Sequence, residues 1–276
     1  MRWIVTGSAL GALAIFGLPA QGALAATQPP GYRLVFKSFP APAGSFTTQG
    51  SAPCPTGTVT WGGGVRIYSG SSPLTIGSSY WNGGTPGGWV GTVGTHSANT
   101  NFEVIATCAN KPRGYKLVTK TVDDPAGMTA SSTIKCAVGS VLLSGGLAST
   151  SDLASVYQLT AAPTSNRGYR GVQVNTSSLD APFHLYALCA AKPAGYIRVS
   201  KTISAEAGLG FDLQTTCPTG SAIIGGGFSV SPASAQVTVS ASSPLPMPTM
   251  PTVWDTIGLN GSAAAVTLTS VAICAA

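Results

Sequence analysis

One stretch decides the fold of this chain: Cys54-Pro55-Thr56-Gly57-Thr58-Val59-Thr60-Trp61-Gly62-Gly63-Gly64. Its pattern, Cys-x2-Gly-x4-(Gly/Ser)-Gly-Gly, returns at Cys136, which leads to Ser144-Gly145-Gly146, and at Cys217, which leads to Gly225-Gly226-Gly227. Self-similarity at a fixed period marks a single structural unit that is written several times. The chain therefore contains three copies of one unit.

Two further signatures set the length of each copy. The pattern Pro-x-Gly-Tyr opens each copy and places tyrosines at Tyr32, Tyr115 and Tyr196, in steps of 83 and 81 residues. A second cysteine in an apolar setting closes each copy, at Cys108, Cys189 and Cys274. We assign residues 27–111 to the first copy, 112–192 to the second and 193–276 to the third.

The first 26 residues read as a secretory signal peptide. Met1-Arg2 is followed by apolar and small residues up to position 18, and then by Ala23-Leu24-Ala25-Ala26. Because Arg2 is the only charge, an uncleaved membrane anchor is the alternative. No other apolar stretch of spanning length follows, so we expect a secreted, extracellular or periplasmic protein without a transmembrane segment in the mature chain.

Six cysteines in an exported chain predict three disulfides. Two pairings respect the repeat, one within each copy and one between neighbouring copies, such as Cys108 with Cys136. We prefer the pairing within copies because each copy then has its own disulfide. The preferred pairs are Cys54–Cys108, Cys136–Cys189 and Cys217–Cys274. Metal ligation lacks the short Cys-x2-Cys spacing, and we predict neither a metal nor another cofactor.

Local patterns predict strands throughout the mature chain. Runs rich in Val, Ile, Thr, Tyr and Phe alternate with Gly, Pro, Ser and Asn, and helical periodicity is absent. In the first copy the strands are expected at residues 32–39, 45–52, 58–68, 74–81, 88–96 and 102–109. The proline-rich residues 244–251 are expected to form a loop.

Three separate sandwiches of this size would each bury little core, and the linkers between copies are too short for independent domains. We therefore predict an all-β fold, a pseudo-threefold β-prism-like body built from the three copies around one axis. In architecture alone it resembles the threefold β-prism lectins, whose repeats are shorter. The Gly-Gly pairs have two interpretations: a bulge or crowded axis, which we prefer, or a backbone cradle for a ligand.

Charge argues against nucleic acid as a partner. Of 14 basic residues Arg2 lies in the signal peptide, which leaves 13 against 8 acidic residues, and the bases are scattered through all three copies. Weak attraction to anionic polysaccharide or lipid headgroups is the most that this balance predicts. Lys37, Lys120 and Lys201 recur in register and either protect strand edges, which we prefer, or surround an anion.

No catalytic set recurs in the sequence. The only histidines, His96 and His184, are not equivalent in the repeat, and no carboxylate stands in register in all three copies. We therefore predict a protein that is not an enzyme, with a secreted hydrolase as a third alternative.

Aromatic residues beside amides carry the functional hypothesis, because an aromatic ring stacks on the apolar face of a sugar while amides bond to its hydroxyls. Trp81 and Asn82 are the residues we most expect on the surface. The alternative is that three of the rings, about twenty residues before each closing cysteine, belong to the core. The candidate ligand-binding residues are Tyr80, Trp81, Asn82, Trp89, Tyr169, Arg170, Trp254 and Asp255.

These features together predict a secreted, non-catalytic, lectin-like protein that binds carbohydrate or another cell-surface ligand. A structural surface or coat protein, or a toxin-associated or inhibitor scaffold, is the alternative. The sequence does not set the oligomeric state.

Overall fold

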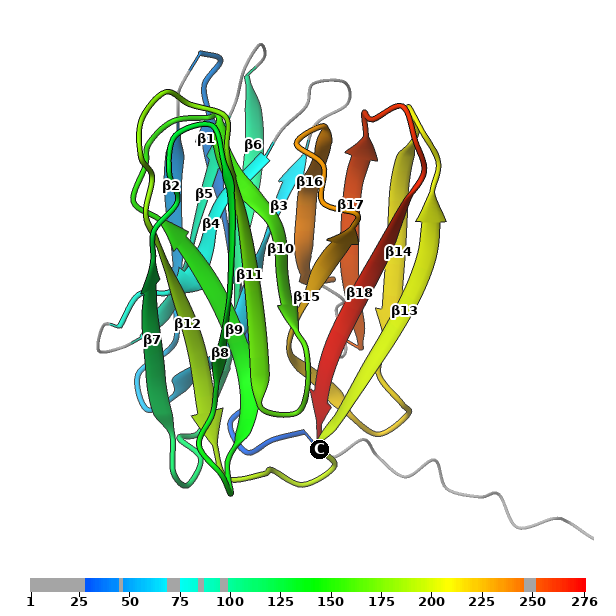
Figure 1. Cartoon of the computed structure of the whole chain (residues 1–276). Coiled ribbons are helices and arrows are strands. Elements are labelled where there is room, and N and C mark those ends of the chain that lie inside the picture. The colour runs from blue at the N-terminus through cyan, green and yellow to red at the C-terminus, as the bar shows by residue number, and fades with distance from the viewer. Residues whose placement is uncertain (1–27, 45–46, 69–74, 84–86, 95–98, 246–251) are drawn as a thin grey trace, which may run out of the picture.

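The computed structural model describes residues 28–44, 47–68, 75–83, 87–94, 99–245 and 252–276. These residues form eighteen β-strands and no helix, so that the described part of the chain has no helix capable of crossing a membrane (Figure 1). The predicted signal peptide, His96 and most of the proline-rich segment lie outside the described residues.

The strands fall into three groups of six, one group per copy, and in the first copy they nearly coincide with the predicted ones. The first group is β1 (Arg33–Ala41), β2 (Thr48–Pro53), β3 (Val59–Tyr68), β4 (Thr75–Trp81), β5 (Gly88–Gly94) and β6 (Thr100–Ala109). The second is β7 (Lys116–Val122), β8 (Thr129–Lys135), β9 (Val141–Ser149), β10 (Val156–Pro163), β11 (Gly168–Asn175) and β12 (Phe183–Ala190). The third is β13 (Ile197–Ala205), β14 (Gly210–Thr216), β15 (Ala222–Ser231), β16 (Val237–Pro244), β17 (Val253–Asn260) and β18 (Val266–Ala275).

The strands form three six-stranded antiparallel sheets, and each sheet is shared by two copies. Sheet A has the order β1-β6-β3-β16-β17-β14, sheet B the order β2-β5-β4-β9-β12-β7, and sheet C the order β13-β18-β15-β10-β11-β8. Each copy therefore gives three strands to one sheet and three to another, and the third copy pairs with the first to close the ring. This is the predicted pseudo-threefold β-prism-like body, with a division of the copies between sheets that the sequence did not predict.

The first residue of each triplet, which is glycine in the first and third copies and Ser144 in the second, lies where the three copies meet. A Cβ atom at Gly62 would stand 2.3 Å from the carbonyl oxygen of Ile224 and 2.9 Å from the Cβ of Ser144, its counterpart in the second copy. A Cβ at Gly225 would stand 2.4 Å from the carbonyl oxygen of Leu143. Such distances are too short for any side chain, and the strand register also shifts beside this position in every copy. The interpretation as a bulge at a crowded axis is confirmed.

The second glycine of each triplet receives an aromatic ring from the neighbouring sheet. A Cβ there would lie 2.4 Å from a ring atom in every copy, so glycine leaves the space that the ring fills. The pairs are Gly63 with Trp89, Gly145 with Tyr169 and Gly226 with Trp254. All three rings line a small cavity in the interior of the prism.

The third glycine lies at the seam where two copies share a sheet. Gly64 meets β16, Gly146 meets β4 and Gly227 meets β10, each with its missing Cβ within 2.4 Å of a backbone carbonyl oxygen. Close approach of two backbones again requires glycine. The triplet therefore serves three separate contacts.

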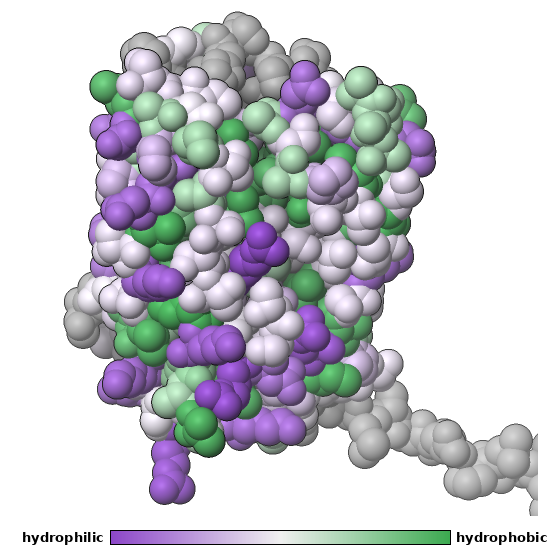
Figure 2. All heavy atoms as spheres, in the orientation of Figure 1, coloured by the Kyte–Doolittle hydropathy of each residue, from purple (hydrophilic) through white to green (hydrophobic). Residues whose placement is uncertain are grey.

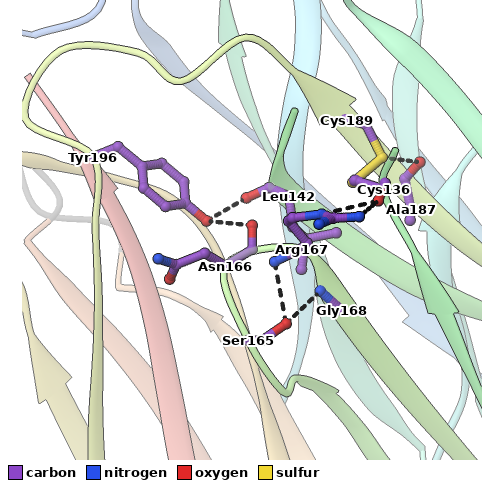
Figure 3. Close-up of a disulfide and its surroundings, with 9 residues drawn as sticks. All are labelled: Cys136, Leu142, Ser165, Asn166, Arg167, Gly168, Ala187, Cys189 and Tyr196. Carbon is purple, nitrogen blue, oxygen red and sulfur yellow. Dashed lines mark hydrogen bonds between the residues drawn. A yellow bond between two sulfur atoms is a disulfide. The ribbon is translucent and has the colours of Figure 1, made fainter. Parts of the chain in front are cut away.

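The Pro-x-Gly-Tyr segments are tight turns that open each copy, and the second and third of them join one copy to the next. In the second copy the amide of Tyr115 donates to the carbonyl of Pro112, and Gly114 between them has a φ of 68°, which suits a type II turn. The hydroxyl of Tyr115 then donates to the carbonyl of Thr60 in the first copy, at 2.5 Å. Equivalent bonds join Tyr32 to Ile223 and Tyr196 to Leu142, the latter shown in Figure 3. The tyrosines therefore link the copies cyclically.

The disulfides are Cys54–Cys108, Cys136–Cys189 and Cys217–Cys274, which is the preferred pairing within copies. All three lie at one end of the prism. The first cysteine of each copy directly follows β2, β8 or β14, and the last residue of that strand pairs with the first residue of β5, β11 or β17. We call this the disulfide end. It carries the chain's C-terminus and is at the bottom of Figure 1.

Candidate functional site

Three of the candidate ligand residues are buried rings. Trp89 and Trp254 are each 1% exposed and Tyr169 is 2% exposed, packed in the interior as described above. The indole Nε1 of Trp89 donates to Ser79 Oγ at 2.8 Å and that of Trp254 to Ser242 Oγ at 3.2 Å. These contacts agree with the alternative that the three rings are core residues, and no surface available to a sugar remains on them.

Trp81 and Asn82 end β4 and begin the turn to β5. Trp81 is partly buried and packs against the main core. Asn82 is exposed, and its Oδ1 accepts a hydrogen bond of 2.9 Å from the amide of Gly88 across the turn. Asn82 therefore helps to close the hairpin, and Trp81 offers less free surface than the sequence predicted.

Tyr80 has a partner that the sequence did not identify. Its ring stacks on that of Tyr186, with centroids 5.4 Å apart and planes inclined by 21°. Gly146 lies between them, because β9 separates β4 from β12 and Gly146 faces Tyr186 in the register. Glycine has no side chain on this outer side of the sheet, so the two rings can meet across it.

Polar side chains extend this stack along the outer face of sheet B. His184 lies edge-on to Tyr186 with centroids 6.4 Å apart, and its Nδ1 is 3.1 Å from the hydroxyl of Thr121. Thr119 faces Tyr186 on the neighbouring edge strand β7. We call these five residues, Tyr80, Tyr186, His184, Thr119 and Thr121, the aromatic face.

The aromatic face is only partly exposed at its rings and has no Asp, Glu, Lys or Arg among its members. Tyr80, Tyr186 and His184 are each partly buried, whereas Thr119 and Thr121 are exposed. Burial raises the pKa of both tyrosines, and the neighbouring phenol of Tyr80 raises the pKa of Tyr186 further. Both phenols are therefore neutral at neutral pH and free to donate or accept hydrogen bonds.

The same row is built differently in the other two sheets. In sheet A the positions of Tyr80, Gly146 and Tyr186 are held by Ser243, Gly64 and Ile105, and in sheet C by Ala162, Gly227 and Val271. The glycine is kept in all three sheets, whereas the ring pair occurs in sheet B alone. The stack is therefore an addition to the fold and not a requirement of it.

Asp255 belongs to a charged network on sheet A. It is 1% exposed and forms an ion pair with Arg66, whose guanidinium lies 6.0 Å from the ring of Tyr68. Burial, with the neighbouring carboxyl of Asp212, raises the pKa of Asp255 to about 6, although Arg66 lowers it. A hydrolase needs a carboxyl that its substrate can reach, whereas Asp255 is buried and paired with Arg66. We assign the network to packing between the copies that share sheet A.

The remaining charged candidates lie apart from the aromatic face. Arg170 is exposed on β11 in sheet C. Lys37, Lys120 and Lys201 are exposed on β1, β7 and β13, which are edge strands of the three sheets, so they fit the role of edge protection. Among the described residues, no three His, Cys, Asp or Glu side chains gather in a way that would hold a metal ion.

No protein-family model matches this chain, and no curated protein matches it either. The functional argument therefore depends on the geometry of the aromatic face.

Proposed function

We propose that this chain is an exported, non-catalytic binding protein that recognises carbohydrate through the aromatic face of sheet B. The observation that supports this most is the stack of Tyr80 on Tyr186, which is present in one sheet and absent from the equivalent rows of the other two. A surface ring pair that the fold does not require is well explained by a ligand.

The chemistry of the aromatic face suits a neutral sugar. The ring of a tyrosine offers an apolar surface for the C–H face of a pyranose, and its hydroxyl offers a hydrogen bond at the rim. His184, Thr119 and Thr121 supply further donors and acceptors at one side of the rings. No Asp, Glu, Lys or Arg side chain of the aromatic face has to be desolvated, which favours a ligand rich in hydroxyl groups.

The face is also rigid before any ligand arrives. Its side chains stand on β4, β7 and β12, inside a hydrogen-bonded sheet and above a disulfide-linked framework. Binding then costs little ordering of the protein, which is an advantage for weak ligands such as sugars. Export in turn is supported by the predicted signal peptide and by three disulfides, which are typical of oxidising compartments.

The test is glycan-array screening followed by calorimetry on any sugar that binds. Tyr186→Ala and Tyr80→Ala are each expected to weaken binding by about tenfold or more, because each removes one ring of the stack. Tyr68→Ala, an exposed tyrosine on sheet A, is the matched control and should bind as the unchanged protein does. Silence on every glycan, or equal loss in the control, would refute the proposal, and concentration-dependent association without sugar would favour the scaffold alternative.

A further inference from the structure

Basic side chains that are scattered in the sequence gather at the disulfide end around one disulfide, Cys136–Cys189. All but Arg167 are exposed, and Arg167 is partly buried. Figure 2 shows hydrophilic residues concentrated at this lower end of the face in view. We call this group the basic corner: Arg113, Lys116, Lys135, Arg167, Arg170 and Lys192.

The register ties three of these residues directly to the disulfide. Lys116 faces Cys189 across the β7–β12 pair, and Lys135 immediately precedes Cys136. Arg167 donates to the carbonyl of Cys136 from Nε at 3.2 Å and from Nη2 at 2.9 Å (Figure 3). Three positive charges therefore surround one disulfide.

The other three residues extend the corner on either side. The carbonyl of Arg113 accepts a hydrogen bond of 2.9 Å from the amide of Ala191, so its turn adjoins Lys192. In the β8–β11 pair, Arg170 lies opposite Thr133, and Lys135 lies two residues further along β8, opposite Gly168. Since side chains alternate along a strand, Lys135 and Arg170 emerge on the same outer side of sheet C.

The pseudo-threefold symmetry provides an internal control for this corner. In the third copy none of the five equivalent positions holds a basic residue, and one holds an acid. These residues are Ala194, Ile197, Thr216, Thr252 and Asp255. In the first copy two of the six equivalent positions are basic, Arg33 and Lys111. The other four hold Pro30, Pro53, Gly87 and Val90. All three copies fold alike, so the fold does not require these charges.

No acidic side chain balances the basic corner. All eight Asp and Glu residues are described by the structure, and they lie either in loops at the opposite end of the prism or on strands of sheet A. The loop acids are Asp123, Asp124, Asp152, Asp180 and Glu206, and those of sheet A are Glu103, Asp212 and Asp255. No acidic side chain therefore lies among the bases of the corner, and the corner attracts anions.

An aliphatic side chain protrudes from the same corner. Val138 is 87% exposed in the turn that follows Cys136, more than any other large apolar side chain in the described residues. Its counterparts in the other copies are Thr56 and Thr219, so a polar residue serves this turn equally well. An exposed aliphatic tip beside several bases is the pattern of a surface that meets lipid headgroups and the upper acyl region.

We propose that the basic corner docks the protein on anionic lipid bilayers. The six bases supply attraction to anionic headgroups, about fivefold in partitioning for each residue that reaches the surface, and Val138 enters the interface. A soluble acidic polymer would use the charges but would gain little from Val138. The corner is separate from the aromatic face, so the two proposals can fail independently.

The experiment is co-sedimentation of the purified protein with vesicles of phosphatidylcholine alone and of phosphatidylcholine with phosphatidylglycerol. Binding is expected only to the anionic vesicles and should weaken as salt is raised. The triple variant Lys116→Ala/Lys135→Ala/Lys192→Ala should reduce partitioning by about tenfold or more. Val138→Thr should reduce it severalfold without any change in charge.

The triple variant Lys37→Ala/Lys120→Ala/Lys201→Ala removes the same charge from the strand edges and is the matched control, expected to bind vesicles nearly as well as the unchanged protein. Equal loss in both triples would overturn the proposal, because net charge alone would then explain binding. An unaffected Val138→Thr variant together with tight binding to soluble dextran sulfate would also overturn it in favour of an acidic polymer. Absence of vesicle binding would refute it outright.

Discussion

Single residues decide how closely the three sheets approach one another. The ring of Tyr169 occupies the space that a side chain at position 145 would need, with a ring atom 2.4 Å from the Cβ position. We expect Gly145→Ala to lower the free energy of unfolding by about 1–3 kcal/mol through overpacking. Urea denaturation followed by fluorescence measures the change.

A matched glycine tests whether the ring contact is the cause. Gly210 also lies in a strand, but a Cβ there would meet only the carbonyl oxygen of Gly258, at 3.6 Å. Gly210→Ala is therefore expected to change stability by less than about 0.5 kcal/mol. Similar losses at both positions would point to backbone effects instead of packing.

Residue patterns predicted the core better than the surface. The spacing of Trp89, Tyr169 and Trp254 before the closing cysteines allowed their burial to be considered from sequence alone. Tyr80 and Trp81 could not both lie on one surface, because neighbours in a strand point to opposite faces. Tyr186 was missed because stacking depends on the pairing of β4 with β9, which joins different copies.

At the scale of strands and turns, the tyrosine that opens each copy also fastens it to another copy. Tyr115→Phe would leave the carbonyl of Thr60, a fully buried residue, without its hydroxyl donor. We expect a loss of about 1–3 kcal/mol in the free energy of unfolding, measured by urea denaturation. Tyr68→Phe, which removes an exposed hydroxyl, should cost less than about 0.5 kcal/mol, and an equal cost would argue against the inter-copy bond.

Strand positions followed from local pattern, whereas strand partners did not. Alternating β-formers and turn residues located the strands of the first copy within a few residues. The equivalent strands β4, β10 and β16 have similar patterns, so nothing local distinguishes which of them pairs with β3. The contact is made by β16, from the far end of the chain, and it depends on the arrangement of the whole body.

At the scale of the whole molecule, no copy contains all the strands of any one sheet. Residues 112–192 alone would leave the seam edges of β9 and β10 unpaired, because their partners β4 and β15 belong to other copies. We expect this fragment not to fold as a monomer, as judged by circular dichroism and the absence of a cooperative thermal transition. A stable monomeric fragment would show that the copies are independent domains.

Closure of the hydrogen-bonded ring has a consequence for how this molecule came to carry different surfaces. Three separate polypeptides of one unit each could use the same seams, but every change in them would appear on all sides at once. Fusion into one polypeptide lets each side acquire its own side chains while the shared interior stays the same. Covalent linkage thus permits an aromatic pair on one side, an ion pair on another and a cationic vertex at only one of three corners.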